Sequence, residues 1–412
     1  MSIVSSWRSD HGTRLRHNRP FWLLWVASTA GYLAGWIIKF ALPLVAAHLT
    51  RSPLLVSGVT TCAMAPWLVL GLPIGALVDR LDRRRTLLFA TSLRIAAAGL
   101  LALVLVAGRA DLPVLYGVAF LLGVTDTLAE TAATAILPML VAHAHLERAN
   151  AHLIGIQQVV EAVSLPLGGA LATLGLAAAV GGGGACYGIA LVALLLVRGA
   201  FRPPARATQH VVADIIEGVC FLWNHRALRT IGIMAGVINA CWTAWLAVLV
   251  LYAVAPGPLR LNAWQYGLVL TGSGIGGVVG VALTGPVQRA LGRRCAIGLN
   301  IGANTLMFAA PGLTANVWVI AVAVFIGGVG GPLWTIAATS LQQRVVPVTL
   351  QGRVSAAYRF LGLGAEAIGP VAGGVIAQAC GVQAVFVLSA LLTALMLLPF
   401  LRVVTEGVMD TT

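Results

Sequence analysis

The stretch Gly75-Ala76-Leu77-Val78-Asp79-Arg80-Leu81-Asp82-Arg83-Arg84-Arg85 directly follows a long apolar run. A related stretch, Gly285-x-x-x-Arg289-x-x-Gly292-Arg293-Arg294, stands 210 residues further along the chain. A second pair of landmarks repeats as well, since Arg148 precedes Glu161 by 13 residues and Arg353 precedes Glu366 by 13. Two parallel six-helix repeats joined by a linker are one known transporter plan, with the substrate held midway between them. The repetition therefore predicts a chain of two equivalent halves.

Composition indicates the solvent in which the chain folds. Hydrophobic residues make up 59% of the 412 residues and charged residues only 9%, whereas a soluble domain carries roughly 25% charge. Lipid is therefore the expected solvent for most of the chain. The net charge of +13 does not predict nucleic-acid binding, because the basic residues form short clusters between apolar runs and no continuous basic face.

Apolar runs long enough to cross a bilayer divide the chain. A transmembrane helix needs about 20 such residues, and charged clusters and Pro/Gly breaks separate twelve runs. We expect an all-α polytopic membrane protein with twelve transmembrane helices in two six-helix bundles related by pseudo-twofold symmetry. The first six cover residues 21–47, 54–77, 86–107, 112–136, 151–174 and 177–197, and the second six cover 228–254, 263–287, 294–311, 314–337, 354–379 and 381–401.

The one long polar stretch of the sequence, Arg198–Arg229, lies between these two sets and predicts a linker with an amphipathic helix over Gln209–Trp223. We expect an N-terminal bundle over 1–197, a cytoplasmic linker over 198–227 and a C-terminal bundle over 228–412.

The placement of Arg predicts the orientation. With the N-terminus inside, the inner segments hold twenty Arg and the outer loops hold three, Arg51, Arg109 and Arg260. Lys and Arg accumulate in cytoplasmic loops. We therefore expect a multi-pass protein of a bacterial inner membrane with both termini cytoplasmic.

The loop Gly75–Arg85 resembles the loop 2–3 signature of the major facilitator superfamily, with Asp82 where that signature often has Gly. Four further stretches are similar to the branch that holds macrolide efflux pumps and the enterobactin exporter: Phe21-Trp22-Leu23-Leu24-Trp25, Ala41-Leu42-Pro43-Leu44, Leu146-Glu147-Arg148-Ala149-Asn150-Ala151 and Gln351-Gly352-Arg353-Val354. The Asp that this branch commonly carries in helix 1 is replaced by Gly35, and Lys39 stands nearby. The resemblance implies secondary active export of a drug-like or secondary-metabolite molecule, by proton antiport and alternating access.

The basic loops are candidates for a cytoplasmic gate. Asp79 can pair with the neighbouring Arg cluster or with a helix N-terminus, whose dipole favours anions. The alternative is that these Arg only fix the topology. The candidate gating residues are Gly75, Asp79, Arg80, Arg83 and Arg84 in the first half and Gly285, Arg289, Arg293 and Arg294 in the second.

Charges inside apolar runs are the sharper functional signal, because each costs about 2.5–3.5 kcal/mol at mid-helix. Glu161 and Glu366 occupy equivalent places, roughly 20 Å beyond their loop Arg at the rise of an α-helix, and are the leading proton-coupling candidates. Asp126 is the reserve candidate. The other charges deep in the expected spans are Glu130, Arg94 and Lys39, whereas Arg359 is expected nearer the cytoplasmic end of its helix.

The remaining charges have two interpretations. Arg94 and Glu130 are at matching depths and could form a static ion pair. Lys39, the only Lys, could pair with Asp126 or hold an anionic substrate. Four acids against two bases lean toward cationic or zwitterionic substrates.

Four Trp residues could line an aromatic cavity, although membrane Trp usually marks the lipid interface. They are Trp36, Trp242, Trp245 and Trp334. The run Gly272-Ser273-Gly274-Ile275-Gly276-Gly277 matches a dinucleotide-binding pattern but stands inside an apolar run with no preceding strand, and therefore predicts close helix packing. His143, His145 and His152 could suggest a metal, but a solvated loop is the simpler interpretation.

The leading functional prediction is a proton-coupled exporter that acts on a small molecule as a monomer in the lipid bilayer, without cofactor or metal. The first alternative is export of a siderophore or lipid-like substrate. A membrane receptor on the same fold is a weaker alternative, and neither a nucleophile–base pair nor metal-ligand spacing predicts an enzyme.

Overall fold

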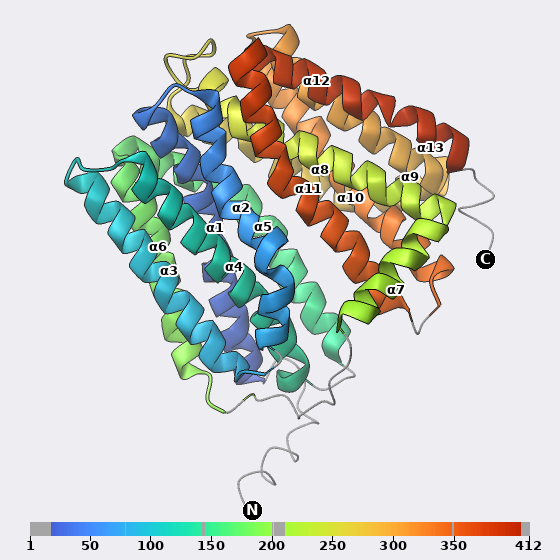
Figure 1. Ribbon diagram of the computed structural model, residues 1–412, viewed down its shortest axis with the longest axis horizontal. Helices are drawn as coiled ribbons and strands as arrows, with labels where there is room; N and C mark the ends of the chain where they lie inside the picture. The colour runs from blue at the N-terminus through green and yellow to red at the C-terminus, as the bar shows by residue number, and fades with distance from the viewer. Residues whose placement is uncertain are drawn as a thin grey trace, which may run out of the picture.

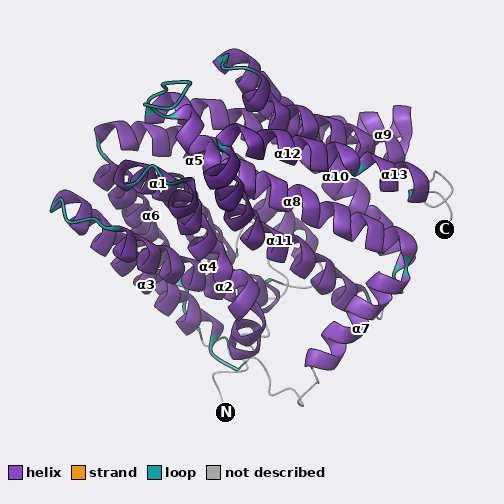
Figure 2. Ribbon diagram, turned by 45° about the horizontal axis from the view of Figure 1, so that its top comes forward, coloured by secondary structure: helices purple, strands orange, loops and turns teal. Residues whose placement is uncertain are grey.

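Helices and short turns make up the part of the chain that the computed structural model describes, residues 18–78, 80–141, 145–199, 201, 211–347 and 350–404 (Figure 1; Figure 2). The helices are α1 Arg19–Leu49, α2 Pro53–Val78, α3 Arg83–Val106, α4 Leu112–Leu140, α5 Leu146–Leu174, α6 Leu176–Leu196, α7 Val211–Asn224, α8 Arg226–Ala253, α9 Ala263–Leu313, α10 Val317–Val345, α11 Gln351–Cys380, α12 Val382–Leu395 and α13 Leu397–Val403.

Local sequence explains where the helices begin and end. A side-chain oxygen that accepts a backbone N–H stabilises the first turn of a helix, and Asn18, Asp82, Asp111, Asn262 and Asn316 do this for α1, α3, α4, α9 and α10. Gly175 and Gly381 have φ of 137° and 87°. Glycine reaches such angles without strain, so the chain passes directly from α5 into α6 and from α11 into α12.

Eleven helices in the described ranges are long and apolar enough to cross a membrane. The expected helices 263–287 and 294–311 run into one element, α9, which has 51 residues and is broken at Gly292, where φ is 81° and ψ is 163°. The expected helix 381–401 is divided at Met396 into α12 and α13, which together count as one span. The expected amphipathic helix over Gln209–Trp223 corresponds to α7.

The helices form two groups. In Figure 1, α1–α6 lie on the left, α8–α13 lie on the right, and α7 lies below α8. Between the groups, α2 packs against α11 and α5 packs against α9. Each group surrounds its own buried apolar cluster, and a third cluster joins both.

The glycine-rich run of α9 is a packing surface, as predicted. A Cβ added at Gly276 would lie 2.2 Å from the carbonyl oxygen of Phe325 in α10, and one at Gly280 would lie 2.4 Å from that of Val329. On another face of α9, a Cβ at Gly274 would lie 2.5 Å from Cα of Ala162 in α5. Glycine therefore allows α9 to contact α10 within its group and α5 in the other group.

Contacts between the two groups gather at the end of the bundle that carries the turns 50–52, 254–262 and 314–316, which we call the far end (Figure 1). Here Ser52 Oγ lies 3.0 Å from Gln378 Oε1, across the α2–α11 contact. The Phe40 and Tyr266 rings stack with centroids 5.5 Å apart. A Cβ added at Gly169 would lie 2.7 Å from the carbonyl oxygen of Ala263. The two groups are thus in tight contact at the far end.

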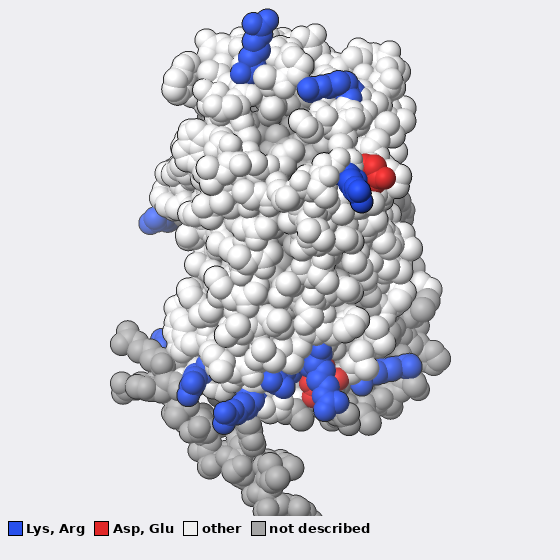
Figure 3. Space-filling view, turned by 90° about the vertical axis from the view of Figure 1, so that its left-hand side faces the viewer, with Lys and Arg blue, Asp and Glu red and all other residues white. Residues whose placement is uncertain are grey.

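The opposite end, where α1 begins, is rich in Arg, and we call it the basic end. Figure 3 shows most of the visible Lys and Arg gathered there, below a broad band that carries few charged side chains. An uncharged band between two charged ends is the surface expected of a protein that spans a bilayer.

Candidate functional site

A cavity of about 260 Å³ lies inside the first group of helices, between α1, α3, α4 and α6. One face of α1, from Leu24 to Lys39, forms a wall of this cavity. Gly31 and Gly35 on that face leave room between the larger side chains. The walls from the other helices, among them Thr91 of α3 and Leu194 of α6, also come from the parts nearer the basic end. The cavity therefore occupies the basic half of the bundle.

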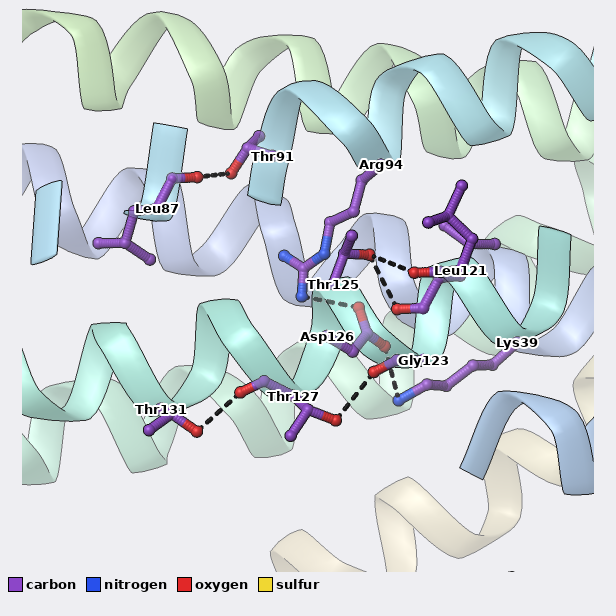
Figure 4. A network of polar contacts seen from close by, with 11 residues as sticks. Lys39, Leu87, Thr91, Arg94, Leu121, Gly123, Thr125, Asp126, Thr127 and Thr131 are labelled. Carbon is purple, nitrogen blue, oxygen red and sulfur yellow. Dashed lines mark hydrogen bonds and ion pairs between the residues drawn. The ribbon is translucent and has the colours of Figure 1, made fainter. Parts of the chain in front are cut away.

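Asp126 stands at the centre of an ion-pair network on the cavity wall (Figure 4). Its Oδ1 lies 2.7 Å from Arg94 NH2, and its Oδ2 lies 3.3 Å from Lys39 Nζ. The side chains of Arg94 and Asp126 are 11% and 15% exposed, whereas that of Lys39 is 45% exposed. Lys39 is thus paired with Asp126, as one interpretation predicted, and is the member of the network most open to the cavity.

The two cations of the network, Arg94 and Lys39, each lie near an aromatic ring. The Arg94 guanidinium lies 5.2 Å from the ring centroid of Tyr187, a fully buried side chain of α6. Lys39 Nζ lies 5.9 Å from the ring centroid of Trp36, one turn earlier on α1. Cations are attracted to aromatic faces within about 6 Å. Arg94 is therefore held on two sides in a buried site, while Lys39 is held more loosely.

Four threonine hydroxyl groups near the network donate within their own helices. Thr125, Thr127 and Thr131 of α4 donate to carbonyl oxygens of their own helix, at distances of 2.7–3.0 Å, and Thr91 donates to Leu87 in the same way (Figure 4). Ser and Thr within helices often form this local bond. The hydroxyl protons of these threonines are therefore already used, whereas the charged side chains of Lys39, Asp126 and Glu130 line the cavity.

The partner in contact with Arg94 is Asp126, not the Glu130 suggested by matching depth. Glu130 lies one turn further along α4 on the cavity wall and interacts with Arg94 electrostatically. Matching depth in the sequence therefore located the partner of Arg94 only to within one helical turn.

The two repeat-related acids have different surroundings. Glu366 of α11 is half-buried and interacts electrostatically with Lys39 and Glu130, so it acts on the cavity from the other group of helices. Glu161 of α5 is also half-buried and immediately precedes Ala162, the residue in contact with Gly274 of α9. Glu161 is therefore next to the contact between the groups.

Of the four predicted cavity Trp residues, Trp36 lines the cavity. Trp245 does not, because it is fully buried against Phe308 and Phe386; the prediction is wrong for this residue in this conformation. Trp242 stacks on Trp245 with ring centroids 5.6 Å apart.

Trp334 is also buried, and its Nε1 donates to the Tyr358 hydroxyl at 3.2 Å. The sequence reveals that these Trp residues are deep in the membrane but not which way they point.

The predicted gating loops contain a residue whose role the sequence analysis missed. Asp82 is buried, and it accepts from Arg85 N and from Phe201 N, each at 3.0 Å. It therefore caps α3 and ties the end of α6 to the loop after α2. An Asp three residues before a backbone N–H at the start of a helical run is an N-cap pattern, and that signal could have identified it. Asp79 lies outside the described residues.

The two basic loops make matching contacts. Arg84 NH2 donates to the carbonyl oxygen of Leu195, near the end of α6, at 3.1 Å. Arg294, its repeat counterpart, donates to that of Leu401 in α13, the last helix of its group, at 3.3 Å. In both groups, then, an Arg at the basic end binds a carbonyl near the end of the last helix of its group, where carbonyls lack intrahelical partners.

The remaining gating candidates also lie at the basic end. Arg83 donates to the Ala135 carbonyl and Arg289 Nε to the Gly285 carbonyl. Arg80 is exposed, and no described contact of Gly75 or Arg293 assigns either a gating role. Of the His residues, His152 packs against the Trp22 ring, with centroids 5.7 Å apart, His145 precedes α5, and His143 lies outside the described residues.

Apolar helices in two groups, with a charged cavity between those of one group, define a multi-pass membrane transporter. The family model described as transmembrane secretion effector matches residues 14–410, and the chain belongs to this family of the major facilitator superfamily.

Known proteins agree with this assignment. The multidrug efflux pump Tap of Mycolicibacterium fortuitum is 29% identical over 378 residues, which cover 88% of this chain and 90% of that protein. The uncharacterized MFS-type transporter YfiS of Bacillus subtilis is 28% identical and covers 90% of each chain. A POT family transporter in complex with 5-aminolevulinic acid has the same fold, with a TM-score of 0.75 at 11% identity and coverage of 97% and 98%.

A bacterial homologue of the iron transporter ferroportin, in its inward-facing state, gives a TM-score of 0.69 at 18% identity, with coverage of 95% of this chain and 99% of that one. At this level of identity the likeness concerns the fold alone.

Proposed function

We propose that the protein exports a small molecule through twelve membrane crossings, with both termini and the linker on the cytoplasmic side. A helix of 51 residues would be about 77 Å long at 1.5 Å per residue, more than twice the roughly 30 Å of a hydrocarbon core. The break of α9 at Gly292, next to two Arg, is therefore assigned to a cytoplasmic turn between two crossings. Residues 1–197 and 228–412 then form equivalent six-helix bundles related by a pseudo-twofold axis.

The transport cycle we propose is alternating access of one cavity. The described contacts between the helix groups are tight at the far end, and the cavity occupies the basic half, so this conformation corresponds to an inward-facing state. Rocking of one bundle against the other would open the far end and close the basic end. The loops after the second and eighth crossings lie at the basic end, where such a gate would close, and each is fixed to the last helix of its own bundle.

Proton antiport is the proposed energy source, with Glu366 as the leading coupling acid and Glu161 as its counterpart. What supports this is the position of Glu366, a half-buried acid of α11 that lies within electrostatic range of Lys39 and Glu130 on the opposite bundle. Acids within the membrane are costly and usually functional. An acid that reaches a cavity across the moving contact changes surroundings during rocking, which links its protonation to conformation.

Dye export into inside-out membrane vesicles with an acidic lumen tests this function. A panel of fluorescent amphipathic dyes identifies one that the wild-type protein accumulates and that is released when nigericin collapses the pH gradient. At least one of Glu161→Gln and Glu366→Gln should abolish uphill accumulation while retaining downhill exchange, because Gln preserves size but carries no titrating proton. Uphill accumulation that survives in both single variants and in the double variant would contradict coupling by this pair.

A further inference from the structure

We propose that the Asp126 carboxylate is the binding site for the cationic group of an aromatic substrate, and that Lys39 is a tethered competitor which moves to Glu366 when that substrate binds. This inference rests on the proposed export function and adds to it a substrate class and a route for coupling. It follows from the contacts of Asp126, from the exposure of Lys39 and from the position of Trp36.

Asp126 offers two oxygens with unequal partners. Arg94 holds Oδ1 at 2.7 Å in a buried site and packs on Tyr187. Lys39 holds Oδ2 at 3.3 Å and is 45% exposed. Arginine stays charged in proteins and forms a rigid fork, whereas the lysine ammonium is a point charge on a flexible stem. Arg94 therefore keeps Asp126 ionised and oriented, while Lys39 can leave.

Lys39 Nζ shows what the vacated position would accept. It is an ammonium placed on a carboxylate and 5.9 Å from the Trp36 ring centroid, at the wall of the 260 Å³ cavity. A substrate ammonium in its place would gain the same ion pair and the same aromatic face. Exchanging one monovalent cation for another leaves the charge of the network unchanged, so no buried charge is left without a partner.

A displaced Lys39 has an acid within electrostatic range. Glu366 of α11 interacts with Lys39 and with Glu130. A nearby ammonium favours the ionised form of a carboxyl group, and a nearby carboxylate disfavours it. When Lys39 turns from Asp126 toward Glu366, it stabilises the ionised Glu366, and a proton leaves that residue.

The movement of Lys39 between the two acids makes substrate binding and proton binding alternate, as antiport requires. Substrate on Asp126 sends Lys39 to Glu366, and a proton is released there. Protonation of Glu366 removes the counter-ion of Lys39, which returns to Asp126 and displaces the substrate. Cation and proton are thus bound in alternation although they occupy different carboxylates. Arg94, Tyr187, Lys39 and Glu130 are the titratable groups that the described residues place around the two acids.

Three matched probes test the substrate class on purified wild-type protein in lipid nanodiscs, by isothermal titration calorimetry. Trimethyl(2-naphthylmethyl)ammonium carries a permanent cation, 2-neopentylnaphthalene is its neutral isostere, and naphthalene-2-sulfonate carries an anion. The cationic probe should bind at least about tenfold more tightly than the other two, the scale of one charge-assisted contact. Preferential binding of the sulfonate, lost in Lys39→Gln, would overturn the proposal.

The Lys39→Gln variant tests the competition, with Lys39→Arg as its matched control. Removing the competitor should raise the affinity for the cationic probe by about tenfold, a gain that misfolding cannot produce. Lys39→Arg keeps a competing cation and should leave the affinity low. An unchanged or reduced affinity in Lys39→Gln would refute the role of Lys39.

Proton release tests the link to Glu366. Titrations in two buffers of different ionisation enthalpy report the protons released on binding, and both Lys39→Gln and Glu366→Gln should release fewer than the wild type. Equal release in all three proteins would overturn the exchange. These binding measurements need no pH gradient. Uphill export can therefore persist when the Lys39 exchange fails, and the exchange can be observed when export is not driven by protons. The proposed function and the proposed exchange can thus be refuted separately.

Discussion

The contact between Gly274 of α9 and Ala162 of α5 provides a direct test of alternating access. A Cβ at Gly274 would lie 2.5 Å from Ala162 Cα, 2.7 Å from its Cβ and 2.9 Å from its N. Ordinary contacts between carbon atoms are about 3.5–4.0 Å. The neighbouring atoms include backbone, so no side-chain rotation relieves the overlap. In Gly274→Ala, α5 and α9 must therefore separate by about 1 Å.

The expected size of the effect follows from packing. Overpacking of this kind costs about 1–3 kcal/mol. If the bundles separate here during the cycle, the cost falls on the far-end-closed state alone. The equilibrium between the two states should then shift by about 5–150-fold toward the far-end-open state. Transport should slow because the inward-facing state is reached less often.

Double electron–electron resonance between spin labels at positions 52 and 378 measures the shift. Their side chains are in contact in the closed state, with Ser52 Oγ 3.0 Å from Gln378 Oε1. The labels require a background in which the six native Cys are replaced. Gly274→Ala should increase the population with a long interspin distance.

Gly277→Ala is the matched control, because it lies one turn away on the same helix and a Cβ there meets nothing within 4 Å. Both variants gain the same helix propensity from Ala. Identical distance distributions in Gly274→Ala and Gly277→Ala would refute the idea that this contact belongs to one state only.

Two further predictions concern the stability of the basic loops, measured as the midpoint of thermal unfolding in detergent by intrinsic fluorescence. Asp82→Ala should destabilise the protein by about 0.5–2 kcal/mol through loss of the α3 cap, and further through loss of the hydrogen bond from Phe201. Asp111→Ala removes an exposed cap of α4 and should cost less. The reverse order would contradict the described role of Asp82. Gly292→Ala should cost about 1–3 kcal/mol, because a φ of 81° with ψ of 163° is open almost only to glycine. Gly285→Ala should be harmless, because a Cβ there meets open space. Equal unfolding midpoints of the two variants would contradict the break at Gly292.

Most of the helices can be predicted from the sequence because a lipid environment leaves the backbone few alternatives. Each backbone polar group must be satisfied within the bilayer, so a run of about 20 apolar residues becomes a helix. The glycine run of α9 was likewise assigned to packing because no strand precedes it, and the contacts of Gly276 and Gly280 confirm that assignment.

Side-chain direction was the part that the sequence could not resolve. Trp245 and Trp36 are both deep Trp residues, yet one is enclosed by Phe308 and Phe386 and the other lines the cavity. Asp126 and Glu130 stand one turn apart on α4, and the packing of α3 against α4 places Arg94 on Asp126. These outcomes depend on how helices pack, which a hydropathy pattern does not specify.

The unequal distribution of charge between the bundles has a mechanical consequence. In the proposed scheme, the substrate site lies within one bundle, on Asp126. The bundles can therefore move relative to each other without changing the geometry of the site. A site confined to one bundle, however, would bind equally well in both states and could not drive rocking. In this scheme Glu366 supplies the missing difference, because it belongs to the other bundle and lies within electrostatic range of Lys39 in this conformation. Rocking alters that interaction, so the occupancy of Asp126 and the position of the bundles become parts of one equilibrium.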